Sequence, residues 1–271
     1  MSAEAYGLYL PKDTIIHRLD PRAKILWFIV VLASSIAFSD PRYSIWIYAS
    51  LIIVGLVARL TPKRFLLVFA NSAIFIAACM VFWPRRPQLQ VGPVIFELPI
   101  LHWKYTEIGL LYALGKAILI VNPITAMLII FSTTFPRDFV QGIMRLGLPY
   151  KAGYILMIAL RFLPVTVRET KEIIEAQMSR GLEIERGNII KRIRNYIPIF
   201  VPLLVRMVKE TVQLGMSMES RCFGAKKQRT FLHELRFTTI DYIWSAGCLL
   251  AFAVVLFIRF YLKMGYVAVA W

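Results

Sequence analysis

Three long apolar stretches of the chain begin in the same way, with a helix-capping side chain followed at once by proline. The pairs are Asp20-Pro21, Asp40-Pro41 and Thr61-Pro62. The side-chain oxygen accepts a hydrogen bond from a free N–H of the first turn, and proline suits the first helical position because it lacks an N–H. The stretches therefore predict helices that begin at these prolines.

These helices are long enough to cross a membrane. Residues 21–38 would form a helix of about 27 Å, close to the roughly 30 Å of a hydrocarbon core. Comparable stretches at 41–60, 62–83, 106–134 and 239–262 bring the predicted number of spans to about five. The composition agrees, because 58% of the 271 residues are hydrophobic, against roughly 45–50% in soluble domains.

Positive charge indicates which side of the membrane each segment faces. The chain has 32 Lys and Arg against 16 Asp and Glu, but nucleic-acid binding is not expected of a chain with several spans. Residues 137–236 alone carry 18 Lys and Arg against 9 Asp and Glu, which predicts a cytoplasmic segment, a cytoplasmic N-terminus and an external C-terminus. We expect 84–105 to be an external loop, and Arg18, Arg22 and Lys24 to contact lipid headgroups.

The basic segment contains a degenerate repeat. After a short amphipathic helix at 136–146, FLPVTVRETKEIIEAQMSRG (162–181) is similar to FVPLLVRMVKETVQLGMSMESRCFG (200–224). The repeat predicts two amphipathic helices of roughly 24–29 Å beneath the bilayer, neither of them apolar enough to cross it. Met207, Leu214 and Met218 recur at helical spacing and predict a packing face between these helices or toward a partner.

Both repeats end in a small-Arg-small triplet, Ser179-Arg180-Gly181 and Ser220-Arg221-Cys222. One interpretation is a helix cap, with Arg at the negative end of the macrodipole and a Gly just past it. The other is a docking tip, because a guanidinium can grip a carboxylate with two hydrogen bonds and small neighbours let a partner's backbone approach. The repetition favours docking on two homologous partners. Arg186 and Arg229 are expected to be solvated.

Four further motifs belong with the triplets. They are His17-Arg18-Leu19-Asp20-Pro21-Arg22 with Lys24, Leu146-Gly147-Leu148-Pro149, Ala159-Leu160-Arg161-Phe162-Leu163-Pro164 and Ala176-Gln177-Met178-Ser179-Arg180-Gly181. Together they resemble the transmembrane T component of energy-coupling factor (ECF) transporters, the EcfT/CbiQ family. That family's triplet is typically Ala-Arg-Gly, so Ser replaces Ala in both copies and Cys222 replaces Gly in the second.

The resemblance implies an L-shaped, all-α integral membrane protein. Its parts would be a membrane region with four transmembrane helices (1–135), a cytoplasmic region with two long and one short coupling helices (136–236), and a last transmembrane helix with an external tail (237–271). Two cytoplasmic ABC-type ATPases would dock on the tips through Arg180 and Arg221, flanked by Ser179, Gly181, Ser220 and Cys222. A separate small membrane protein, the S component, would capture a vitamin or a metal ion.

No catalytic, cofactor or metal site is expected in the chain itself. The stretch from Gly109 to Lys116 looks like a phosphate-binding loop, but five residues separate its glycines where four are needed, and Ala117 replaces the Ser or Thr that binds Mg²⁺. His17, His102 and His233 are scattered. ATP and Mg²⁺ would be bound by the partner ATPases.

The expected location is the plasma membrane of a prokaryote. The alternative function is a stand-alone secondary carrier or a membrane scaffold with its own substrate path. A carrier needs polar residues at mid-membrane depth, for which the candidates are Asn71, Lys116 and Asn122.

Overall fold

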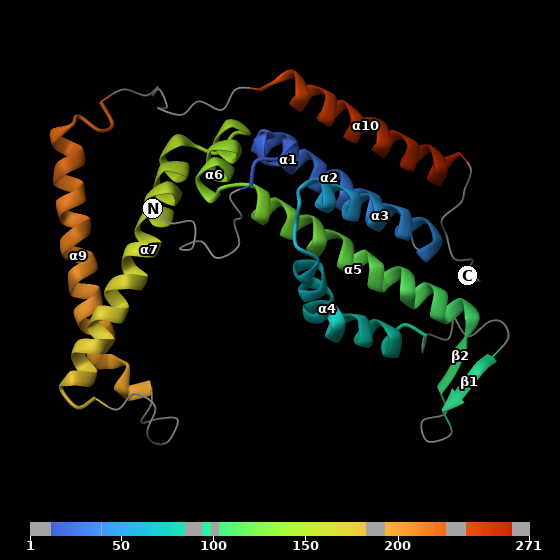
Figure 1. Ribbon diagram of the computed structural model, residues 1–271, viewed down its shortest axis with the longest axis horizontal. Helices are drawn as coiled ribbons and strands as arrows, with labels where there is room; N and C mark the ends of the chain where they lie inside the picture. The colour runs from blue at the N-terminus through green and yellow to red at the C-terminus, as the bar shows by residue number, and fades with distance from the viewer. Residues whose placement is uncertain are drawn as a thin grey trace. The chain divides into compact units, whose positions relative to one another are not determined.

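The computed structural model describes residues 12–38, 40–84, 94–98, 103–182, 193–225 and 237–261 (Figure 1). Contacts divide the chain into two compact units, Met1–Leu148 with Leu235–Trp271, and Pro149–Glu234. Arg186, Arg229 and the end of the chain after 261 lie outside the described residues.

The first unit contains most of the helices. They are α1 (Ile15–Arg18), α2 (Pro21–Ala37), α3 (Pro41–Val57), α4 (Pro62–Phe82), α5 (Glu107–Thr133), α6 (Pro136–Arg145) and α10 (Thr239–Phe260). The second unit contains α7 (Tyr150–Ser179) and α9 (Ile197–Ser220).

The predicted helix starts are confirmed at all three prolines. Asp20 Oδ1 accepts a hydrogen bond from the Arg22 N–H at 2.9 Å, and Asp40 Oδ1 accepts one from the Arg42 N–H at 3.0 Å. Thr61 is the N-cap of α4 but its side chain accepts no such bond. Proline at the first position therefore marks the helix start even where the capping hydrogen bond is missing.

Four of the described helices are long and apolar enough to cross a membrane, namely α4, α5, α7 and α10. Helix α3 is also apolar but shorter. Both α2 and α3 have 17 residues, which corresponds to about 26 Å. The chain is thus an all-α, multi-pass membrane protein, and the count of five crossings stays a prediction.

Helix α7 corrects one prediction. The repeat suggested a helix from Phe162 that is too polar to cross a membrane, but α7 begins at Tyr150 and has 30 residues, with Pro164 inside it. In the stretch 150–167 only Lys151 and Arg161 are charged. The repeated sequence begins only at Phe162, so the prediction did not include the apolar first half of α7. The charges that made the repeat look too polar lie in the second half of α7.

The predicted loop at 84–105 contains a β-hairpin. Strands β1 (Val94–Leu98) and β2 (Trp103–Thr106) pair antiparallel, with Val94 opposite Thr106, Leu98 opposite Trp103 and a register shift between Val94 and Phe96. The hairpin leads directly into α5, whose N-cap Thr106 accepts a hydrogen bond from the Gly109 N–H at 3.3 Å. It is a small addition to an otherwise helical fold.

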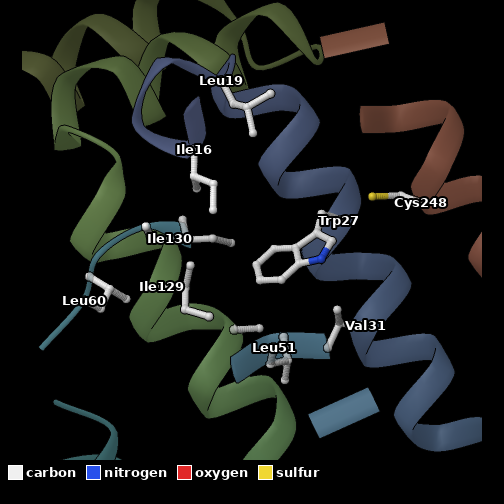
Figure 2. Close-up of a cluster of buried hydrophobic side chains, with 11 residues drawn as sticks. Ile16, Leu19, Trp27, Val31, Leu51, Leu60, Ile129, Ile130 and Cys248 are labelled. Atoms are coloured by element: carbon white, nitrogen blue, oxygen red, sulfur yellow. The ribbon is translucent and has the colours of Figure 1, made fainter. Parts of the chain in front are cut away.

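Helix α5 is the centre of the first unit, because it packs against α2, α3 and α4 (Figure 1). Its Ile129 and Ile130 meet Trp27 of α2 and Leu51 of α3 in the hydrophobic core (Figure 2). Small and polar residues of α5 are buried as well, and Asn122 donates to Ser35 Oγ at 3.2 Å. Close packing through small residues and hydrogen bonds between helices is how membrane helices associate.

The stretch that resembles a phosphate-binding loop lies inside α5 and is helical throughout. Lys116 in this stretch is half buried. Its ammonium lies 5.6 Å from the ring centre of Trp83 and 5.2 Å from that of Tyr112. Cation–π contact therefore accommodates this charge within an apolar helix.

Helix α6 was predicted as part of the cytoplasmic coupling region, and by its contacts it belongs to the first unit. The contact is close at Gly142, where an added Cβ would lie 2.8 Å from Pro21 Cβ. A glycine is required there because any side chain would push α6 away from the start of α2.

Lys24 does not contact lipid headgroups, contrary to the prediction. Its side chain is buried, and its ammonium donates to Thr133 O at 3.0 Å and Thr134 Oγ1 at 2.9 Å. The end of α5 has carbonyl and hydroxyl oxygens that its own helix does not satisfy, and these oxygens bind the ammonium instead of water or phosphate. Arg22 is partly buried beside Asp20 and Phe237, and Arg18 is exposed.

Helix α10 is attached to the start of α2 by a buried carboxylate. Asp241 Oδ1 accepts from the Asp20 N–H at 2.8 Å, and Asp241 Oδ2 accepts from the N–H and the hydroxyl of Thr238 at 2.8 and 2.7 Å. At its other end α10 contributes Arg259, which donates to Ala37 O at the end of α2. Polar contacts at both ends thus fix the register of α10 along α2.

Replacement of Asp241 by Ala should destabilise the protein by about 2–4 kcal/mol, because the buried N–H of Asp20 and the part-buried N–H of Thr238 lose their acceptor. The measurement is thermal unfolding in detergent. Asp13→Ala is the control, since Asp13 makes only a 3.9 Å ion pair and its side chain is 90% exposed. Equal stability of the two variants would contradict an anchoring role for Asp241.

Candidate functional site

The two triplets close α7 and α9 with the same backbone motif. Helix α7 ends at Ser179 with Arg180 as its C-cap, and α9 ends at Ser220 with Arg221 as its C-cap. In α7 the N–H groups of Gly181 and Leu182 donate to Met178 O and Gln177 O at 2.9 and 3.1 Å. This pair of bonds is a Schellman motif, which satisfies the last carbonyls of a helix.

Helix α9 repeats these bonds residue for residue. The N–H groups of Cys222 and Phe223 donate to Glu219 O and Met218 O at 2.9 and 3.0 Å. A Schellman motif needs a left-handed residue after the C-cap, and Gly181 has φ +87° while Cys222 has φ +53°. The cysteine therefore takes the conformation that glycine takes in the first copy, and the triplets agree in backbone geometry as well as in sequence.

Both arginines are exposed at the helix tips. In the part of the chain that the structure describes, no ion pair joins Arg180 or Arg221 to a carboxylate. The neighbouring hydroxyls bond back to their own helices, Ser179 to Glu175 O at 2.9 Å and Ser220 to Ser217 O at 3.0 Å. Each guanidinium is thus held on a well-ordered helix end with its donors open to a partner.

The end of α9 packs on the beginning of α7. The ring of Phe223 lies 4.5 Å from that of Tyr154, measured between ring centres, and Met218 Sδ lies 4.0 Å from Tyr154 Oη. Further along, Arg206 of α9 contacts Glu169 of α7. The later residue of α9 thus contacts the earlier residue of α7, and the earlier residue of α9 contacts the later one. The two helices therefore run antiparallel.

The antiparallel arrangement separates the two tips. Arg221 lies beside the start of α7 near Tyr154, whereas Arg180 lies at the end of α7. At 1.5 Å per residue, the stretch from Tyr154 to Arg180 is about 40 Å long. The two arginines of the candidate site therefore do not form one pocket.

A cluster of charges joins the middle of the two helices. The Arg206 guanidinium lies 3.3 Å from Glu169, 3.5 Å from Glu172 and 3.9 Å from Glu210. Burial raises the pKa of Glu169, the neighbouring Glu210 raises it further, and the Arg206 guanidinium opposes the rise. Sequence analysis missed this cluster; the Arg206-to-Glu210 spacing of four residues was its only local signal.

Loss of Arg206 should weaken the α7–α9 pair. Arg206→Ala leaves Glu169 buried without a cation, at an expected cost of about 1–2 kcal/mol, less than for a fully buried pair because Arg206 is half exposed. Adding Glu169→Gln to this variant should restore part of the loss, since the buried charge is then removed. Thermal unfolding of Arg206→Ala, of Glu169→Gln and of the double variant in detergent measures this, and strictly additive effects would show that the contact contributes nothing.

Replacement of Cys222 by Gly should stabilise the end of α9 by about 1 kcal/mol, because a side chain in the left-handed conformation carries a penalty that glycine avoids. Gly181→Ala should destabilise α7 by a similar amount, although space is open around that position. Cys222→Ser is the control, since it keeps the penalty. If the Cys222→Gly and Cys222→Ser variants have the same unfolding curve, the left-handed conformation of Cys222 carries no measurable strain and the prediction is wrong.

The family model for CbiQ, described as a cobalt transport protein, matches residues 12–232. The chain belongs to the CbiQ family. The matched region contains both triplets, the contacts of Lys24 with the end of α5, and all of α7 and α9. The resemblance that the sequence motifs indicated is thus confirmed.

Similar proteins in the CbiQ family cover almost the whole chain. A protein of Bacillus selenitireducens is 31% identical over 264 residues, which is 94% of this chain and 96% of the relative. One of Ruminiclostridium cellulolyticum is 32% identical over 248 residues (87% and 89%), and one of Clostridium kluyveri is 29% identical over 250 residues (88% and 90%). All three are named energy-coupling factor transporter transmembrane protein EcfT. This CbiQ-family chain is therefore a transmembrane component of a transporter.

Proposed function

We propose that the chain is the coupling subunit of an ECF-type importer. In this role it transmits the ATP-driven motion of two cytoplasmic ABC-type ATPases to a small membrane S component. The S component selects the substrate, a vitamin or a metal ion. The ATPases bind ATP and Mg²⁺, and the chain itself catalyses no reaction.

The observation that carries the proposal is the pair of matching helix ends. Two exposed arginines sit on the same backbone motif at opposite ends of an antiparallel helix pair, about 40 Å apart by helix rise. An active site would bring its groups together, whereas this arrangement offers one equal contact to each of two partners. A carboxylate in a groove of each ATPase would receive the planar fork of the guanidinium.

Charge supports the proposed orientation. The excess of Lys and Arg in 137–236 favours the cytoplasm for the whole α7–α9 pair, and with it for the N-terminus. Helix α7 does not cross the membrane in this proposal, although it is long and apolar enough to do so, because a crossing would put the two tips on opposite sides of the bilayer. The proposed location is the plasma membrane of a prokaryote. The L-shaped arrangement and the external C-terminus stay predictions.

The arginines are tested by Arg180→Ala and Arg221→Ala. Each should weaken ATPase docking by roughly 2–5 kcal/mol, because the partner's carboxylate is left desolvated and unpaired. Arg→Lys at either position should rescue poorly, since the ammonium lacks the bidentate fork. Lys171→Ala and Lys209→Ala are matched controls, because both lysines are exposed on the same two helices.

The measurements are co-purification from the native host and substrate uptake. The unaltered chain should bring down two ATP-binding chains and a small hydrophobic one, and the arginine variants should lose the ATP-binding chains while their thermal unfolding is unchanged. Arginine variants that behave like the lysine controls would reduce the triplets to helix caps. A chain that purifies alone and transports by itself would instead be a secondary carrier.

A further inference from the structure

An apolar groove follows helix α10 along the first unit. Its volume is about 410 Å³. Helix α10 lines it with the positions 240, 243, 244, 247, 248, 251 and 255, α2 with Trp27, Val30, Val31 and Ser34, and α3 with Ile47, Ser50 and Val54. The positions on α10 follow one helical face from Ile240 to Val255, a rise of about 22 Å.

A wider pocket of about 720 Å³ opens at the end of this groove. It is formed by α1 with the residues that flank it, the end of α3 and the start of α10, and it is lined by Arg18 and Arg59. Ile240 lines both the pocket and the groove, so the two adjoin at the start of α10. The pocket thus forms a mouth with charged side chains beside an apolar groove between membrane helices.

The charge of the mouth favours an anion. Asp241 also lines it, but both of its oxygens already accept hydrogen bonds from Asp20 and Thr238. Asp13 is 90% exposed and only 3.9 Å from Arg18. Lys12 lies close by, since its ammonium donates to Arg59 O at 2.8 Å. Two arginines therefore line the mouth and Lys12 lies beside Arg59. Of the two carboxylates in the lining, Asp13 is exposed and Asp241 is already hydrogen-bonded.

The surroundings of α10 favour a lipid as the occupant. This helix is apolar enough to cross a membrane, and only 6% of its most apolar 18-residue stretch is buried inside the protein. A groove between such helices opens toward the hydrocarbon core, where an empty space loses dispersion contacts on all its walls. An acyl chain is the molecule available there, and its phosphate lies where the helices reach the membrane surface.

We propose that this groove and its mouth bind one glycerophospholipid. An acyl chain lies along α10 in the groove lined by Trp27 and Trp244, whose rings contact each other with centres 6.4 Å apart. The phosphate is held by Arg18 and Arg59. The lipid would lie in the groove that α10 forms with α2 and α3, beside the direct contact of α10 with α2. The proposal is independent of the coupling role of Arg180 and Arg221.

Gly247 provides a direct test, because an added Cβ there meets no atom within 4 Å and would extend into the groove. Gly247→Leu should fill the channel without a clash. Ala246→Leu adds the same side chain at an exposed neighbouring position outside the groove. The full chain is purified in detergent, and the phospholipid retained per chain is measured by extraction and mass spectrometry.

The unaltered chain and the Ala246→Leu variant should retain about one phospholipid per chain, and Gly247→Leu should retain less than half of that. Equal retention by all three would overturn the proposal. Loss of a partner chain from the Gly247→Leu variant with lipid retention unchanged would make the groove a protein interface, and would overturn it as well.

The mouth is tested by titrating dioleoyl phosphatidylglycerol into the delipidated chain and following thermal unfolding. The Arg18→Gln and Arg59→Gln variants should each need about tenfold more of this lipid for the same shift, since each loses a charged hydrogen bond. Lys63→Gln, an exposed cation that does not line the mouth, should behave like the unaltered chain. Equal stabilisation by dioleoylglycerol, which has the same tails and no phosphate, would refute phosphate binding.

Discussion

Backbone N–H and C=O groups inside a bilayer have to be hydrogen-bonded within the helix that contains them. Only the first and last turns of a helix keep groups that another residue can satisfy. In this chain several of the polar contacts between helices lie at such ends. Asp241 at the start of α10 binds the start of α2, Lys24 binds the end of α5, and two arginines close α7 and α9. The constraint of the membrane thus decides where chemistry can occur in the molecule.

These helix ends fall into two kinds. At the start of α2 the charged groups are buried, and the carbonyl and hydroxyl groups of Thr133 and Thr134 satisfy the Lys24 ammonium. At the tips of α7 and α9 the guanidinium groups are exposed, and within the described parts of the chain their serine neighbours bond to their own helices. The first kind fixes helices to one another and the second leaves donors unused. Unused donors on ordered helix ends are what the proposed docking on ATPases requires.

Features that depend on residues adjacent in the sequence, such as helix starts and ends, could be predicted from the sequence. The Asp-Pro and Thr-Pro pairs located the starts of three helices, and the Ser-Arg-small triplets located the ends of two others. The side-chain partners were not predictable in this way. Lys24 looked like a headgroup contact because its acceptors Thr133 and Thr134 lie 109 and 110 residues away. Arg206 likewise meets Glu169 only because α7 and α9 run antiparallel, and a repeat in the sequence gives no direction.

The antiparallel direction of α7 and α9 decides where the two copies of the repeat place their arginines. Two copies of a helix packed in parallel would bring their equal ends together, and both arginines would then face the same partner. The antiparallel packing of α7 and α9, fixed by Tyr154 with Phe223 and by Arg206 with Glu169, puts equal ends at opposite limits of the pair. Cys222 adopts the left-handed conformation that Gly181 adopts, so the second end keeps the geometry of the first despite the different residue. A strained cysteine in place of a glycine is the cost of keeping two equivalent tips on one chain, and equivalence is needed when two similar partners bind.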